Sequence, residues 1–355
     1  MKLGLGLYRH MLNEQHYRFA KQCGATHIII HLVDYFKGGN QASLNNQPIG
    51  DLAGWGLAGD PDQLWTSEEL VQIREDLSKY DLTLEGIENF DPAHWYDILL
   101  DGPQRAKHIE NCKTIIRNVG RAGIPVFGYN FSLAGVAGRI TEDSARGNAT
   151  SVGLHGNNHM LEQPIPKGMI WNMIYDQHAD AGFQPEITHE QLWWRLKGFL
   201  DEILPVAEEA GVIMAAHPDD PPLKYVRKQP RLVYQPHMYQ DLIDINASRS
   251  NKLEFCLGTI SEMTEGDIYK VTDQYTKQNR VAYIHFRNVR GKVPHYQETF
   301  IDEGDIDMER IVEILKKNRF EGVLVPDHTP QMACDAPWHA GMAYAMGYMK
   351  ALIKS

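Results

Sequence analysis

Features that mark secreted or membrane-spanning proteins are scarce in this sequence. It has four cysteines in 355 residues and no Cys-x-x-Cys pair, so we expect a reducing compartment rather than a disulfide framework. No window approaches the roughly 18 consecutive apolar residues of a membrane-spanning helix. The N-terminal run MKLGLGLYRH is too short and too polar for a signal peptide, and we expect it to form a strand. These features predict a cytoplasmic protein with no membrane partner.

Positive charge is also scarce. The 35 Lys and Arg residues are outnumbered by 46 Asp and Glu residues, which gives a formal net charge of -11 at pH 7. Because proteins that bind nucleic acid concentrate Lys and Arg, we expect no nucleic-acid partner. A small anionic substrate remains compatible with this balance, since only the local field of a site acts on it. The hydrophobic fraction of 43% is sufficient for a large buried core.

Short apolar or β-branched runs alternate with amphipathic segments of helix length, which is typical of repeated βα units. We expect eight strands: Lys2–Leu7, Thr26–Leu32, Leu82–Asn89, Ile124–Asn130, Val212–His217, Leu253–Gly258, Val281–Arg287 and Gly322–Asp327. We expect helices at Glu14–Cys23, Ser67–Lys79, Gln104–Ala122, Glu190–Ala210, Ile268–Gln278, Met308–Asn318 and near Ala340–Ile353. Eight parallel strands with following helices predict an α/β fold, the (β/α)8 TIM barrel, whose active site lies at the carboxyl ends of its strands.

Two long segments interrupt this rhythm, Tyr35–Trp65 after the second strand and Ser132–Glu186 after the fourth. Loops of this length in a compact domain are usually functional lids or contact arms. We find no domain boundary and expect one domain over residues 1–355 with two insertions. In the helix after the second insertion, Trp193, Trp194 and Phe199 are expected to pack against the barrel.

Four side chains at the ends of the last four expected strands are candidate metal ligands: His217, Cys256, His285 and Asp327. Imidazole, thiolate and carboxylate all bind divalent ions, and the strand ends of a barrel converge. Each residue alone is more often an ordinary buried or hydrogen-bonded side chain, but four equivalent positions favour a shared ion. The ion stays open, because His and Cys suit Zn, Fe or Co, whereas an oxygen-rich substrate suits Mn or Mg.

Several long motifs resemble mannonate dehydratases. They are GIENFDPAHWYDILLDGPQRAKHIENCKTIIRNVGRAGIPVFGYNF at residues 86–131, AAHPDDPP, RNVRG, ETFIDEGDIDM and PDHTPQMACD. The resemblance extends from the first strand to about residue 335. It implies a xylose-isomerase-like barrel and a divalent metal, most commonly Mn2+. It also implies the conversion of D-mannonate, a sugar acid, to 2-keto-3-deoxy-D-gluconate and water in hexuronate breakdown.

The resemblance implies roles for individual residues. It assigns the metal to the same four residues found from the strand ends, and proton transfer to His328. It implies that the substrate is bound by Asn89, Tyr129, Asn130 and Arg287. A surface salt bridge is the alternative for Arg287. Glu298 matches a glutamate of the family, and for it a role in the site and a solvent-exposed position both stay open.

The chain also departs from the family pattern. The family's Pro-Gly-Tyr triplet is Pro337, Trp338 and His339 here, so His339 stands where the family has a tyrosine implicated in proton transfer. Histidine exchanges protons near neutral pH, which makes His339 a second catalytic candidate, with an ordinary exposed residue as the alternative. Tyr344 and Val325 replace two arginines of the family. These differences indicate a divergent member.

Three functions remain open from the sequence. The first is a metal-dependent dehydratase of a sugar acid, a hydro-lyase. The second is a metal-dependent sugar isomerase or epimerase, since related barrels use similar metal clusters to move protons between carbons. The third is a catalytically silent paralogue that binds sugar acids. The resemblance further implies a homo-oligomer, with Ser132–Glu186 as a candidate contact arm.

Overall fold

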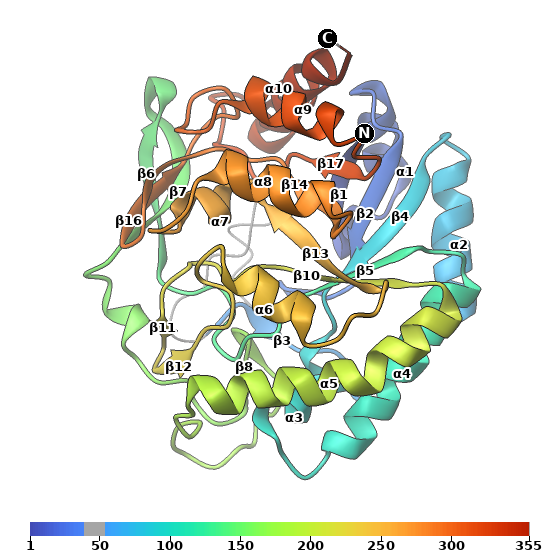
Figure 1. Ribbon diagram of the computed structural model, residues 1–355, viewed down its shortest axis with the longest axis vertical. Helices are drawn as coiled ribbons and strands as arrows, with labels where there is room; N and C mark the ends of the chain where they lie inside the picture. The colour runs from blue at the N-terminus through green and yellow to red at the C-terminus, as the bar shows by residue number, and fades with distance from the viewer. Residues whose placement is uncertain (39–53, 355) are drawn as a thin grey trace.

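The computed structural model describes residues 1–38 and 54–354 (Figure 1). Eight parallel strands close into a barrel in the order β1-β17-β14-β13-β10-β5-β4-β2. Their bounds are β1 (Lys2–Tyr8), β2 (His27–His31), β4 (Thr83–Glu88), β5 (Val126–Tyr129), β10 (Ile213–Ala216), β13 (Asn251–Cys256), β14 (Val281–His285) and β17 (Val323–Val325). Every expected strand is in the barrel, so the predicted TIM barrel is confirmed.

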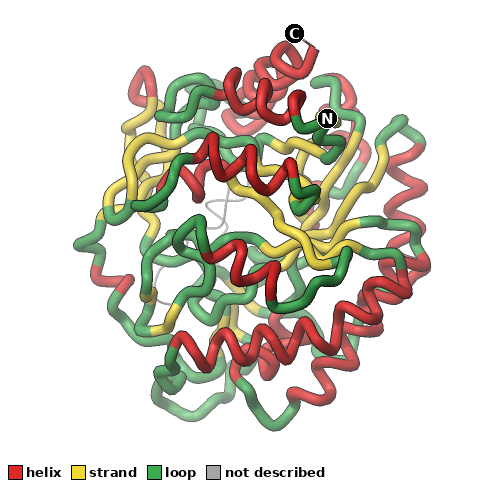
Figure 2. The backbone as a smooth tube through the Cα atoms, viewed as in Figure 1, coloured by secondary structure: helices red, strands yellow, loops and turns green. Residues whose placement is uncertain are grey.

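Helices surround the barrel strands (Figure 2). The seven expected ones are α1 (Glu14–Gln22), α2 (Ser67–Ser78), α4 (Arg105–Arg121), α5 (His189–Ala210), α8 (Ile268–Lys277), α9 (Met308–Lys317) and α10 (Pro337–Lys354). Three short ones were not expected: α3 (Pro92–Leu100), α6 (Met238–Asp244) and α7 (Leu257–Glu262). Short 3-10 turns are η1 (Arg9–Met11), η3 (Arg146–Asn148) and η4 (His159–Leu161). Among the described residues, no helix combines the length and the apolar character needed to cross a membrane.

The second insertion folds onto the rest of the chain. Its hairpin β6 (Arg139–Ala145) and β7 (Ala149–His155) forms a four-stranded sheet with β15 (Val289–Lys292) and β16 (His295–Glu298). Its strands β8 (Met169–Ile170) and β9 (Met173–Ile174) pair with each other, and β9 also pairs with β3 (Gly56–Leu57) of the first insertion. A separate short pair joins β11 (Tyr225–Val226) to β12 (Gln229–Pro230). Part of the first insertion, residues 39–53, lies outside the described residues.

Helix α5 packs on the barrel through an aromatic cluster. The Phe199 ring lies 5.7 Å from Tyr129 and 5.6 Å from Phe131, measured between ring centroids, and its side chain is fully buried. Trp193 is partly buried against the same core. The prediction for Trp194 is wrong, because this side chain is 62% exposed. Adjacent residues on a helix point about 100° apart, which places Trp193 at the margin of the buried face and Trp194 outside it.

The two aromatic positions on α5 give a matched stability test. We expect Phe199→Ala to lower the free energy of unfolding by about 3–5 kcal/mol, because it leaves a cavity in a packed core. Trp194→Ala should change it by no more than about 0.5 kcal/mol, as is usual for an exposed position. Chemical denaturation of both variants checks this, and equal destabilisation would contradict the described packing.

Candidate active site

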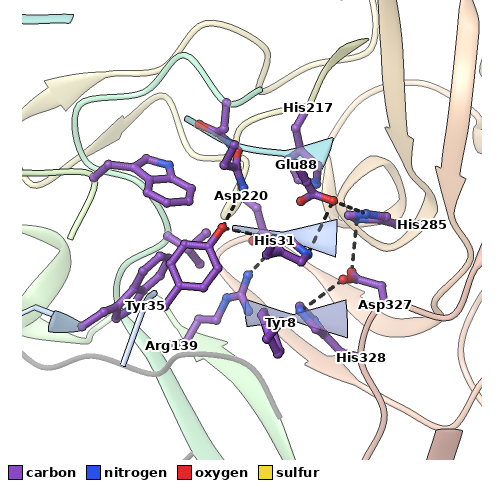
Figure 3. Close-up of a pocket in the computed structure, with 15 residues that line it drawn as sticks. Tyr8, His31, Tyr35, Glu88, Arg139, His217, Asp220, His285, Asp327 and His328 are labelled. Atoms are coloured by element: carbon purple, nitrogen blue, oxygen red, sulfur yellow. Dashed lines mark hydrogen bonds and ion pairs between the residues drawn. The ribbon is translucent and has the colours of Figure 1, made fainter. Parts of the chain in front are cut away.

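A cavity opens at the carboxyl ends of the barrel strands (Figure 3). Asn89, Asn130 and His217 directly follow β4, β5 and β10, and His285 is the last residue of β14. The two insertions contribute further side chains to the lining of the cavity. The lining residues are Tyr8, His31, Tyr35, Trp55, Glu88, Asn89, Asn130, Val136, Arg139, Trp171, His217, Asp220, His285, Asp327 and His328.

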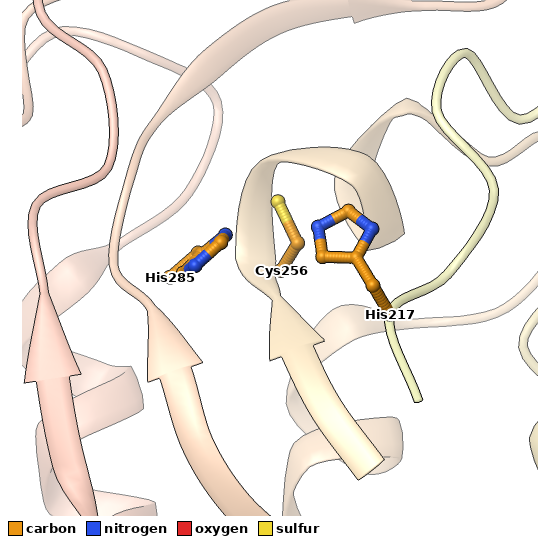
Figure 4. Close-up of side chains that lie close together, drawn as sticks. All are labelled: His217, Cys256 and His285. Carbon is orange, nitrogen blue, oxygen red and sulfur yellow. The ribbon is translucent and has the colours of Figure 1, made fainter. Parts of the chain in front are cut away.

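Three candidate metal ligands lie together at the ends of the adjacent strands β10, β13 and β14 (Figure 4), and two of them, His217 and His285, line the cavity. One ligand atom from each of His217, Cys256 and His285 lies within 4.8 Å of the other two. Asp327 lies at the edge of this group, with Oδ2 3.5 Å from His285 Nδ1. Its carboxylate also contacts Arg287 Nε at 3.1 Å. The structure therefore gathers the four predicted ligands, three of them in a tight group.

The donor atoms in this group fit a divalent ion. His217 Nδ1 lies 2.6 Å from the carbonyl oxygen of Pro218, which assigns the proton to Nδ1 and leaves the lone pair on Nε2. His285 Nδ1 is buried and forms no hydrogen bond with a described residue. Burial alone would raise the pKa of the Cys256 thiol, but the positive charge of the nearby Arg287 guanidinium holds it well below its usual value. Cys256 is thus held as a thiolate, the form that binds metal.

A buried charge network surrounds the candidate ligands. Arg287 is 2% exposed, and its guanidinium lies 2.8 Å from Asp220 Oδ2 and 2.9 Å from Glu262 Oε1. The alternative of a surface salt bridge for Arg287 is thereby excluded, because the side chain is buried. Arg287 does not line the cavity, whereas Arg139, which bonds Asp220 Oδ2 at 3.0 Å, does. Burial would raise the pKa of Asp220, but these two arginines lower it to about 2.

The predicted substrate-binding residues divide between two faces of their strands. Asn89 lines the cavity and donates from Nδ2 to Tyr35 Oη at 3.1 Å. Asn130 also lines it, and its Oδ1 is buried without a hydrogen-bond partner among the described residues. Tyr129 does not line the cavity and packs on α5 instead, because successive strand residues point to opposite faces.

His328 and Glu298 lie together beside the cavity. His328 lines it, with Nδ1 3.1 Å from Glu298 Oε1 and Nε2 3.3 Å from Asp327 Oδ1. Glu298 is buried, so the solvent-exposed alternative does not hold. Burial would raise the pKa of Glu298, but the neighbouring His328 and the two arginines lower it. The carboxylates on either side of His328 orient its ring toward the cavity.

His339 does not lie at the cavity. It is the third residue of α10, and its ring packs on α1, with its centroid 4.7 Å from Phe19 and 5.5 Å from His16. The neighbouring Trp338 borders a smaller hollow next to the cavity, together with Tyr8 and His31. The structure therefore brings Trp338, and not His339, toward the barrel interior.

Several residues of the site were missed from the sequence. Tyr8, His31 and Glu88 are the last residues of β1, β2 and β4. The rule that identified the metal ligands from strand ends therefore applies to them as well. Arg139, Trp55 and Trp171 come from the insertions, whose path the sequence pattern does not define.

Comparisons with known proteins identify the family of this chain. The family model of D-mannonate dehydratase (UxuA) matches residues 21–354. The mannonate dehydratase of Streptococcus pneumoniae (strain 70585) is 32% identical over 276 residues, which cover 75% of this chain and 75% of that protein. The mannonate dehydratase of Geobacillus thermodenitrificans (strain NG80-2) is 30% identical over 285 residues, which cover 75% of this chain and 76% of that protein.

Solved structures show the same relationship. The crystal structure of mannonate dehydratase from Streptococcus suis serotype 2 superposes with a TM-score of 0.77 at 25% identity, covering 100% of this chain and 93% of that one. D-Psicose 3-epimerase from Clostridium cellulolyticum H10 reaches a TM-score of 0.58 at 12% identity over 99% of each chain, which shows the fold alone. The family model and the curated relatives together show that this chain belongs to the D-mannonate dehydratase family and is an enzyme of the hydro-lyase type.

Proposed function

We propose that this enzyme removes water from D-mannonate to give 2-keto-3-deoxy-D-gluconate, and that it depends on a divalent metal, most simply Mn2+. Family membership supports the reaction. The observation that carries the proposal is the group His217, Cys256 and His285 at the cavity, with Asp327 at its edge. Mg, Fe, Co and Zn are the alternative ions. The homo-oligomer and the cytoplasmic location stay predictions.

The proposed ion would be held by His217, Cys256, His285 and Asp327. When bound, it supplies a Lewis acid that stabilises negative charge developing on substrate oxygens. The reaction itself is an elimination. A base takes the proton from C2, the C2–H electrons form the C2=C3 double bond, and the C3–O bond breaks. The leaving oxygen takes a proton and departs as water, and the resulting enol becomes the 2-keto product. Two proton-transfer groups are therefore needed.

His328 is the proposed base, because it lines the cavity and its Nδ1 is hydrogen-bonded to Glu298 Oε1 at 3.1 Å, which leaves the lone pair on Nε2 to take the proton. For the proton donor to the leaving oxygen we propose Tyr8 in place of His339. Tyr8 lines the cavity. Burial and the nearby Asp327 carboxylate raise the pKa of Tyr8, so it is protonated at neutral pH but a weaker acid than a free phenol, and its position at the cavity is what supports the donor role. A phenol in this state can donate a proton.

Arg139 is the proposed anchor for the substrate carboxylate. Its guanidinium lines the cavity, and its Nε is buried without a hydrogen-bond partner among the described residues. A planar guanidinium binds a carboxylate through paired hydrogen bonds. Asn89 and Asn130 are proposed to bind substrate hydroxyls. Arg287 is proposed to act indirectly, by fixing Asp220 and Asp327.

Metal-stripped protein with and without added Mn2+ tests the proposed function. We expect 2-keto-3-deoxy product from D-mannonate only when Mn2+ is present, as followed by product assay. His217→Ala and Cys256→Ala should lose both bound metal, measured by elemental analysis, and turnover, since each removes a ligand. Bound metal without product would favour the silent paralogue, and epimerised sugar acid would favour the epimerase. Parent levels of metal in both variants would refute the ligand assignment.

Tyr8 and His339 make opposite predictions for the proton donor. We expect Tyr8→Phe to lower kcat by about 100-fold to 10,000-fold, the usual contribution of a positioned proton donor, while Mn2+ binding is retained. His339→Gln should leave kcat at the parent value, because His339 packs on α1. Steady-state kinetics of the two variants decide between them. The reverse pattern would restore His339 as the catalytic residue.

Arg139 can be tested against a second arginine of the same hairpin. Arg139→Lys keeps a positive charge beside Asp220 but removes the planar pair of donors. We expect kcat/KM for D-mannonate to fall about tenfold to 100-fold, the range for a lost hydrogen bond to a charged group. Arg146→Ala is the control, because Arg146 is paired with Asp302 at the surface. Unchanged kcat/KM in Arg139→Lys would exclude the anchor role.

A further inference from the structure

Two buried glutamates lie next to the proposed metal ligands inside the barrel. Glu88 is the last residue of β4, and Glu254 precedes Cys256 by two residues on β13, so Glu254 and Cys256 point to the same side of their strand. Glu254 is fully buried. A Cβ atom on Gly128 of β5 would lie 2.6 Å from Glu254 Oε2 and 3.2 Å from Glu88 Cγ. The missing side chain of Gly128 therefore provides the space for this carboxylate pair.

Both carboxylates face the same nitrogen of His285. His285 Nε2 lies 3.2 Å from Glu88 Oε2 and 3.1 Å from Glu254 Oε1 (Figure 3 shows the contact with Glu88). Tyr283 donates its hydroxyl hydrogen to Glu88 Oε2 at 3.2 Å, which fixes that carboxylate. The other ring nitrogen, Nδ1, faces Asp327 Oδ2 at 3.5 Å. One edge of the ring is thus turned to the glutamates and the other to Asp327, one of the proposed metal ligands.

We infer that Glu88 and Glu254 are positioning residues that hold the Nε2–H of His285 and thereby aim its Nδ1 lone pair at the metal. A neutral imidazole has one donor and one acceptor nitrogen, so a partner that accepts from Nε2 leaves Nδ1 as the ligand atom. A carboxylate behind a ligand histidine also makes the ring a stronger ligand. This inference rests on the proposed metal site.

An ion bound directly by the glutamates is the competing explanation, because Glu88, Glu254 and His285 also offer one ligand atom each within 4.8 Å of the others. The contacts favour positioning. Glu88 Oε2 already accepts from the Tyr283 hydroxyl and faces His285 Nε2, and Glu254 Oε1 faces the same nitrogen. A cation among these three residues would have to displace the Tyr283 hydroxyl and the His285 Nε2–H from Glu88 Oε2. No such displacement is needed for an ion on the Nδ1 side.

Mn2+ titration of metal-free protein tests the inference without reference to turnover. Glu88→Gln and Glu254→Gln keep the size of each side chain but remove its charge. Loss of a carboxylate behind a ligand histidine usually weakens metal binding by about tenfold to 100-fold. We expect about a tenfold rise in the Mn2+ Kd for each variant and about a 100-fold rise for the double variant, with one Mn2+ per chain retained in all. Calorimetric titration gives both numbers.

Glu85→Gln is the matched control, since Glu85 lies three residues before Glu88 and is paired with Lys2 at 3.1 Å. Its Kd for Mn2+ should equal that of the parent. A parent-like Kd in the double variant would overturn the inference. So would two Mn2+ ions per parent chain, or complete loss of metal in Glu254→Gln, because either result makes the glutamates ligands. Melting curves confirm that each variant is folded, and the single variants decide if the double variant is not.

The outcome is separable from that of the proposed function. Tight binding of one Mn2+ that weakens in the two glutamine variants upholds the positioning role even if D-mannonate is not turned over. If the parent turns over D-mannonate but the glutamine variants bind Mn2+ with the parent's Kd, the proposed reaction is upheld and the positioning role is rejected.

Discussion

The site depends on how the barrel neutralises buried charge. An isolated ion costs several kcal/mol to bury, and removing one member of a buried pair leaves the other uncompensated. Arg287 provides the compensating positive charge for three buried acidic residues, because its guanidinium lies within 3.1 Å of Asp220, Glu262 and Asp327. The same positive charge lowers the pKa of the Cys256 thiol. The position of one guanidinium thus sets the geometry of Asp327 and the ionisation of Cys256 together.

The two insertions and the barrel strands together supply the residues that line the cavity. The strand ends supply histidines and carboxylates to the lining of the cavity. Tryptophan side chains come from the two insertions, which are far apart in sequence. The ring centroids of Trp55, in the first insertion, and Trp171, in the second, lie 5.3 Å apart in an edge-to-face arrangement. The ring centroid of Tyr35 lies 5.7 Å from that of Trp55. The pairing of β3 with β9 joins these segments. Residues of both insertions therefore line the cavity together with the strand ends.

The sequence was sufficient for the barrel because its strands are buried on both faces and read as short apolar runs bounded by turns. The strand-end rule also located His217, Cys256 and His285, since parallel strands in a closed barrel end at one rim. The rule fails where orientation matters. Tyr129 and Asn130 are adjacent in sequence and face opposite sides, and sequence alone does not say which one faces the cavity. Arg139 could not be predicted, because its position depends on how a long insertion folds back over the barrel.

The departures from the family pattern follow from these same contacts. Val325 is buried in the barrel interior, in an apolar cluster with Ile29 and Val323, so the arginine expected at this position has been replaced by a side chain that packs there. Two arginines on other elements supply positive charge at the candidate site: Arg139 on β6, and Arg287 two residues after the end of β14. A substituted position in a barrel site therefore has to be judged by the charge of the whole rim, since any strand end or insertion can supply the missing group.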